Sequence, residues 1–123
     1  MTTAEEDAPL KSGMLFKKGK RMLGLFGRAN WKPRYAVLTP KALTYYTAPS
    51  GKLKGRIDLN QVSPNDIDVM PRECLKTGKS KSSIWRIAIQ TPKRRFFIAT
   101  QSAMEMNAWA IALANATKHN ALV

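Results

Sequence analysis

The hydrophobic period of this sequence changes once, near residue 100, and that change limits the fold more than any other feature. Before it, short apolar runs alternate with polar residues and are separated by turns, a pattern typical of antiparallel strands. After it, four apolar residues recur at the spacing of one helix face: Met106, Trp109, Ala110 and Leu113. Ser102, followed three residues later by Glu105, forms a capping box before them. The sequence therefore predicts about seven short strands and then one helix from about Ala103 to about Lys118.

The expected strands are apolar or alternating segments bounded by turns that contain Pro or Gly. They cover residues 11–18, 31–38, 42–47, 54–59, 67–70, 83–90 and 94–100. In the second strand, alternation places residues on opposite faces: Trp31, Tyr35 and Val37 on one, Lys32, Arg34 and Ala36 on the other. Residues 71–82 are expected to form an exposed basic loop. A sheet of this size leaves an open end or face, and the helix is expected to cover it.

The length of 123 residues suits one domain with a single core. We expect a flexible acidic tail over residues 1–9, the domain over 10–119 and a C-terminal tail over 120–123. A single cysteine, Cys74, excludes an internal disulfide and agrees with a reducing compartment. No apolar run approaches the ~18 residues of a membrane-spanning helix, and the N-terminus does not resemble a signal peptide. These features indicate a cytoplasmic location.

The charge distribution is the strongest functional signal. The chain contains 21 Lys and Arg against 8 Asp and Glu, for a formal net charge of +13. Between residues 8 and 57 there are twelve basic residues and no acidic one. Such asymmetry predicts an anionic partner, either a nucleic acid or a lipid headgroup.

Residues 17–34 combine an apolar cluster with basic residues on both sides. The apolar residues, which stand beside Gly24 and Gly27, are Met22, Leu23, Leu25 and Phe26. Their spacing fits neither a long amphipathic helix nor an alternating strand, so a loop is predicted. A loop with an apolar tip and a basic base suits an anionic membrane surface. We therefore expect these four residues to insert into the membrane and four others to provide accessory basic contacts: Lys18, Lys20, Arg21 and Arg28.

Six segments in order resemble the pleckstrin-homology (PH) domain family over about residues 11–118. They are SGMLFKKG, WKPRYAVLT, ALTYY, LKGRIDL, RRFFIATQS and EMNAWAIAL, and the last contains the helix tryptophan, Trp109. The resemblance implies a mainly β fold, a PH-like barrel or sandwich of about seven antiparallel strands in two near-orthogonal sheets. One C-terminal α-helix would cap it. The resemblance also implies loops at the opposite end that bind phosphoinositides.

The lipid-binding signature of the family maps onto Lys17, Lys32 and Arg34, and the resemblance adds Tyr45 and Lys54. The chemistry can also be argued without the family. Phosphate monoesters carry about −1.5 to −2 charges each and need convergent donors. Lys32 and Arg34 lie two residues apart on one strand, so they project to the same side. Lys17 reaches them if the first two strands pair as a hairpin.

Three functions remain open at this stage. The favoured one is a peripheral membrane module that binds phosphoinositides or an anionic membrane surface and recruits its protein in signalling or trafficking. The alternatives are a protein-docking module of the same fold and, less favoured, a nucleic-acid-binding protein. The aromatic residues do not line one strand face beside basic ones, which argues against binding of single-stranded nucleic acid.

No enzymatic activity is expected from the residue types present. The folded part has too few carboxylates for a paired acid–base site. Cys74 lacks a nearby histidine or second cysteine that could make it a nucleophile or a metal ligand. The sequence therefore predicts no catalytic residue, no metal site and no cofactor.

Overall fold

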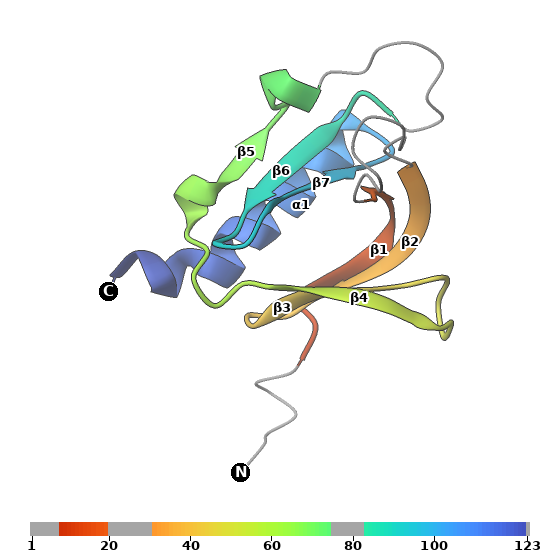
Figure 1. The fold of residues 1–123 in the computed structure, drawn as a ribbon, viewed down its shortest axis with the longest axis horizontal. Coiled ribbons are helices and arrows are strands. Elements are labelled where there is room, and N and C mark those ends of the chain that lie inside the picture. Colours follow the sequence, from red (N-terminus) through yellow and green to blue (C-terminus); the bar gives the residue numbers. More distant parts are fainter. Residues whose placement is uncertain (1–7, 20–30, 75–82, 123) are drawn as a thin grey trace.

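The computed structural model describes residues 8–19, 31–74 and 83–122, and its fold is mainly β (Figure 1). The seven strands are β1 Lys11–Lys18, β2 Trp31–Leu38, β3 Ala42–Tyr46, β4 Leu53–Asp58, β5 Ile67–Val69, β6 Arg86–Gln90 and β7 Arg95–Ala99. One helix, α1 Ala103–Thr117, follows them. Three short 3-10 helices are η1 Pro64–Asp66, η2 Arg72–Cys74 and η3 Lys118–Leu122. The predicted order of strands and helix is confirmed.

All seven strands belong to one antiparallel sheet in the order β4-β3-β2-β1-β7-β6-β5. β1 pairs with β2 along its whole length but with β7 only through Phe16–Ala99 and Lys17–Ile98. The two groups of strands that the resemblance predicts as separate sheets, β1–β4 and β5–β7, are thus connected into one sheet by the short β1–β7 pairing. Figure 1 shows β6 and β7 facing β3 and β4, with α1 behind β6 and β7. β4 and β5 form the two edges of the sheet.

The core lies between the sheet and α1. Trp109 is 0% exposed and packs with Met106 and Leu113 against buried strand residues such as Leu15 and Ile98. This confirms the predicted apolar stripe of the helix, which also buries Ala116 and Thr117. Ile57 and Leu59 are also fully buried.

The start of the helix follows only part of the expected capping pattern. The Oγ of Ser102 accepts a hydrogen bond from the backbone N–H of Glu105 over 3.1 Å, as predicted. The Glu105 carboxylate lies 3.7 Å from Lys11 Nζ, so it connects the helix to β1. α1 ends at Thr117, one residue before the predicted end.

The prediction of an exposed loop over residues 71–82 is wrong for its first part. Pro71 and Cys74 are buried, and Arg86 Nη1 donates a hydrogen bond to the carbonyl of Cys74 over 2.9 Å. Residues 75–82 lie outside the described residues. The expected strand over 83–90 begins only at Arg86, because the hydroxyl of Ser83 accepts from the Trp85 N–H and donates to the Thr100 carbonyl. The Trp85 carbonyl accepts a hydrogen bond from the Thr100 N–H over 2.8 Å, so one backbone bond to the residue after β7 lies just before Arg86.

The end of the described chain is bonded to the segment that follows β4. The Nδ2 of Asn120 donates to the carbonyls of Leu59 and Val62 over 3.0 and 2.7 Å. The predicted boundaries of the two tails stay predictions. Within the described ranges, no helix combines the length and the apolar character needed to cross a membrane.

Candidate functional site

Three of the basic residues expected at the headgroup site meet where β1 ends and β2 begins. Lys17 and Lys32 are direct partners in the β1–β2 ladder, and Arg34 is opposite Leu15. Because directly opposite residues share a face and residues two apart do so along a strand, all three basic residues are on one face. That face is the core face, since Ala36 continues it and is 0% exposed. The face of β2 therefore changes from apolar to cationic as it leaves the core.

Lys17 is held in an unusual environment for a lysine. Its side chain is only 8% exposed, and its Nζ lies 4.7 Å from the ring centroid of Tyr45 and 5.3 Å from that of Phe96. The Nζ also donates to the carbonyl of Lys18 over 3.3 Å. Burial lowers the pKa of Lys17 from 10.5 to about 8, and the positive charges of Arg94 and Arg34 contribute to this lowering.

Tyr45 enters the site from β3. It is opposite Ala36 in the β2–β3 ladder and opposite Gly55 in the β3–β4 ladder. A Cβ on Gly55 would overlap with the ring and hydroxyl of Tyr45, so glycine is needed for the ring to lie across β4. Burial raises the pKa of the Tyr45 hydroxyl, although the charges of Arg94 and Arg34 oppose this shift.

Arg94 is a fourth cation of the site, and the sequence analysis missed it. Its guanidinium carbon lies 4.3 Å from the ring centroid of Phe96, and its charge reaches Lys17 and Tyr45. Strand alternation could have identified it, because Ile98 is a buried core residue and Arg94 is four residues before it. We call Lys17, Lys32, Arg34 and Arg94 the basic cluster.

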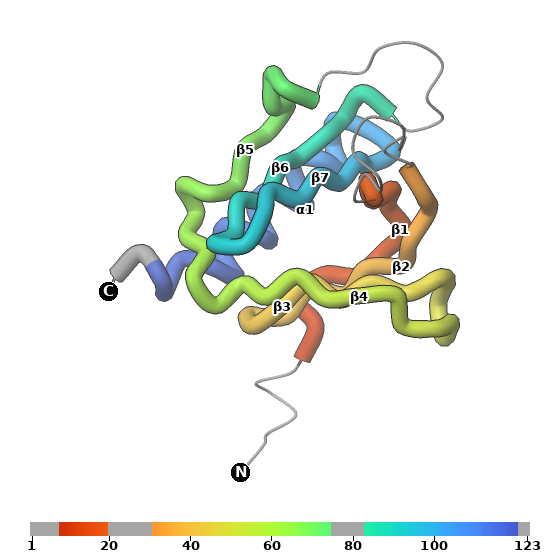
Figure 2. The backbone as a smooth tube through the Cα atoms, in the orientation of Figure 1, coloured from red at the N-terminus to blue at the C-terminus, as the bar shows by residue number. Residues whose placement is uncertain are grey.

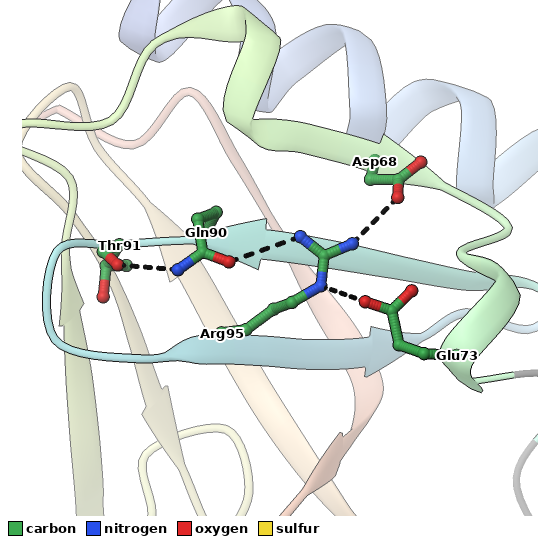
Figure 3. Close-up of polar contacts among 5 residues, drawn as sticks. All are labelled: Asp68, Glu73, Gln90, Thr91 and Arg95. Atoms are coloured by element: carbon green, nitrogen blue, oxygen red, sulfur yellow. Dashed lines mark hydrogen bonds and ion pairs between the residues drawn. The ribbon is translucent and has the colours of Figure 1, made fainter.

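The turn that carries Arg94 is braced by hydrogen bonds. The Oγ1 of Thr91 donates to the Arg94 carbonyl over 2.8 Å and accepts from the backbone N–H of Arg94 over 3.1 Å. Gln90 Nε2 donates to the Thr91 carbonyl over 2.9 Å, and Gln90 Oε1 accepts from Arg95 (Figure 3). Hydrogen bonds among residues 90–94 therefore hold the backbone of this turn.

On the opposite face of β7, Arg95 connects separate elements. Its guanidinium lies 2.8 Å from the carboxylate of Asp68 on β5 and 2.5 Å from that of Glu73 on η2 (Figure 3). A hydrogen bond from its own backbone lowers the pKa of Glu73, and the hydrogen bond from Arg95 adds to this effect. Arg95 thus connects β7 to β5 and η2, while its neighbour Arg94 belongs to the basic cluster on the other face.

The remaining predicted site residues are placed differently. Lys54 is exposed and is the extra residue of a β-bulge between the pairs Tyr45–Gly55 and Tyr46–Leu53, so it has no partner in the β3–β4 ladder and its role at the site stays a prediction. The Nζ of Lys18 lies 5.1 Å from the Phe97 ring centroid, on the other face of the sheet. The other accessory and insertion residues lie outside the described residues: Lys20, Arg21, Met22, Leu23, Leu25, Phe26 and Arg28.

The charges of the basic cluster are not neutralised within the part of the chain that the structure describes. The ion pairs found there involve Lys11 and Arg95, and no carboxylate pairs with a member of the cluster. No group of three or more potential metal ligands occurs among the same residues. Convergent lysines and arginines around a hydroxyl are suited to a polyanion rather than a metal ion.

Comparisons with known proteins agree with this architecture. The family model described as PH domain matches residues 9–118. The C-terminal PH domain of pleckstrin, solved in complex with D-myo-Ins(1,2,3,4,5)P5, is similar with 25% identity and a TM-score of 0.63, covering 90% of this chain and 100% of that one. The C-terminal PH domain of human pleckstrin has 24% identity and a TM-score of 0.68, covering 98% and 97%. A search of curated proteins finds no match.

Proposed function

The chain belongs to the PH-domain family, and we propose that it is a membrane-recruitment module whose basic cluster binds phosphoinositide headgroups. The observation that carries this proposal is the convergence of four cations on the core face, around a nearly buried lysine, without a neutralising carboxylate among the described residues. The similar pleckstrin domain was solved with an inositol phosphate, which supports the same class of ligand here.

The unfavourable electrostatic environment of the Lys17 ammonium supports an anionic ligand. Its lowered pKa means that the ammonium is less favourable here than in water, because water is removed and Arg94 and Arg34 repel it. A phosphate at this place would reverse both effects by providing hydrogen-bond acceptors and negative charge. Binding would therefore recover part of the free energy that burial of the Lys17 ammonium costs.

Each member of the cluster has a distinct role in this proposal. Arg34 and Arg94 present planar guanidinium groups that can each hold two phosphate oxygens. Lys32 and Lys17 act as point charges between them, and the Tyr45 hydroxyl can donate a further hydrogen bond. One Nη1–H of Arg34 is used by the Pro33 carbonyl over 2.8 Å, which leaves other donors for the ligand.

Membrane attachment in this proposal combines headgroup binding with the apolar and basic residues of the segment 20–30, for which the sequence predicts a loop. Basic residues near an anionic surface are worth about 1 kcal/mol each and are screened by salt. Burial of the apolar residues predicted for insertion adds a contribution that salt hardly changes. The module would then act at the cytoplasmic face of a membrane as a peripheral protein.

The test is binding to phosphatidylcholine vesicles that contain phosphoinositides, compared with vesicles whose charge is matched by phosphatidylserine. We expect Arg34→Glu to abolish the preference for phosphoinositide vesicles while the melting temperature stays nearly unchanged. Arg72→Glu is the matched control, because Arg72 is exposed on η2 and the variant changes the net charge by the same amount. Unaltered binding by Arg34→Glu would refute the proposal and favour a protein-docking PH domain.

A further inference from the structure

A second groove lies between the end of β4 and the β6–β7 turn. It encloses about 360 Å³ and is lined by Arg56, Asp58 and Asn60 on one side and by Thr91, Lys93 and Arg94 on the other. A neighbouring hollow of about 310 Å³ continues past Arg56, Asp58 and Asn60 to Lys41 and His119. Figure 2 shows the β6–β7 turn beside the segment that follows β4. We call the first of these the β4 groove.

The backbone of β4 has free hydrogen-bonding groups in this groove. The Leu59 N–H donates to the Lys41 carbonyl over 3.0 Å, so Lys41 and Leu59 form a hydrogen-bonded pair. In an antiparallel ladder such pairs alternate with non-hydrogen-bonded ones. Ala42–Asp58 and Thr44–Arg56 are therefore non-hydrogen-bonded pairs, and the N–H and C=O of Arg56 and Asp58 point away from β3. Since β4 is an edge of the sheet, none of the strands that the structure describes pairs with these groups.

The groove is also cationic. Arg56, Lys93 and Arg94 face one carboxylate, that of Asp58, whose Oδ1 accepts a hydrogen bond from the Asn60 N–H over 2.9 Å. Neither Arg56 nor Lys93 has an ion-pair partner among the described residues. The hydrogen bonds of Thr91 hold the opposite wall in place, including a bond from the Lys93 N–H to Thr91 Oγ1 over 3.3 Å.

We propose that the β4 groove binds an acidic, extended peptide segment of a partner protein, which adds to the sheet beside β4. The free backbone groups of Arg56 and Asp58 would pair with the peptide backbone, as in other cases of strand addition. Arg56 and Lys93 would attract its carboxylates, whereas they would repel a basic strand. The bulge before Gly55 limits the pairing to the C-terminal part of β4.

Two features separate this ligand from a phosphoinositide. The groove offers one row of backbone donors and acceptors, which an inositol phosphate cannot match but an extended peptide can. It also contains a carboxylate, Asp58, which repels a phosphate of about −1.5 to −2 charges more strongly than it repels the single charge of a peptide carboxylate. The groove shares only Arg94 with the basic cluster, so the two sites can be tested with different variants.

The first experiment measures fluorescence anisotropy of a short labelled peptide in which glutamate alternates with valine, titrated with the whole chain. The control peptides replace glutamate with lysine, or carry N-methyl groups on alternate residues to remove backbone donors. We expect the N-methylated peptide to bind at least ~10-fold more weakly than the unmodified one and the lysine peptide not to bind. Equal binding of the N-methylated peptide would overturn strand addition.

The second experiment uses variants of each site. Arg56→Glu should weaken peptide binding at least ~10-fold while phosphoinositide-vesicle binding is retained, and Arg34→Glu should do the reverse. Asp58→Asn, which removes the opposing charge, should tighten peptide binding. Arg56→Gln provides a milder variant if Arg56→Glu lowers the melting temperature. Retained peptide binding by Arg56→Gln, or loss of vesicle binding together with peptide binding, would overturn a separate peptide site even if the headgroup proposal holds.

Discussion

Replacing Lys17 with methionine should make the protein more stable and weaken the phosphoinositide binding that we propose. Methionine keeps an unbranched side chain but removes the ammonium, whose Nζ lies near the rings of Tyr45 and Phe96. The pKa of Lys17 is lowered from 10.5 to about 8, a difference of about 2.5. At 1.36 kcal/mol per pKa unit, the charged Lys17 destabilises the folded protein by at most ~3.4 kcal/mol. The two rings attract the cation and some water reaches it, so we expect a gain of ~1–2 kcal/mol for the variant.

The dependence of this gain on pH gives the decisive measurement. Below about pH 8, Lys17 is charged in both states, and the wild type carries the full penalty. Between about pH 8 and 10.5 the unfolded chain binds more protons at Lys17 than the folded one, so wild-type stability rises from this group. Urea unfolding of both proteins should therefore show a gain that is largest at neutral pH and shrinks as pH rises through this window. A variant that is less stable at neutral pH, or a gain that does not change with pH, would refute the reasoning.

Three further perturbations test other parts of the molecule. Trp109→Ala should cost ~3–5 kcal/mol in urea unfolding, because the side chain is fully buried against the sheet, and a loss below ~1 kcal/mol would contradict its core role. Leu25→Ala combined with Phe26→Ala should abolish vesicle binding at high salt, where wild type keeps part of it, and leave affinity for soluble inositol phosphate unchanged. Arg95→Gln should lower the melting temperature at neutral pH. That loss should shrink as the pH falls through the lowered pKa of Glu73, and a loss independent of pH would exclude the ion pair as its cause.

The hydrophobic period was enough to predict the parts of the fold that depend on burial alone. The limits of β1 and β2 and the start of α1 agree with the sequence prediction, because alternation and helical spacing report directly which face meets the core. The burial of Pro71 and Cys74 could not be predicted in this way. It depends on Arg86, which reaches across from β6 to the Cys74 carbonyl, and a long-range contact of this kind leaves no local pattern.

The same distinction applies to the candidate site. Lys17, Lys32 and Arg34 could be grouped from the sequence, because hairpin pairing of β1 and β2 fixes their register. Lys54 could not be grouped with them in this way, because it is the extra residue of a bulge between β3 and β4. A bulge shifts the register without a clear signal in the residue types. The alternation of residues along β4 therefore does not predict on which face of the sheet Lys54 lies.

The adjacent residues Arg94 and Arg95 lie on opposite faces of the sheet and have different roles. Arg95 is engaged by Asp68, Glu73 and Gln90, so its charge is compensated and it contributes to structure. Arg94 has only the ring of Phe96 as a neighbour for its guanidinium group among the contacts described, and its charge acts on Lys17. A shift of β7 by one residue would exchange the two side chains between faces. The ion pairs of Arg95 therefore hold the register that keeps Arg94 uncompensated and directed to the place where we propose that a polyanion binds.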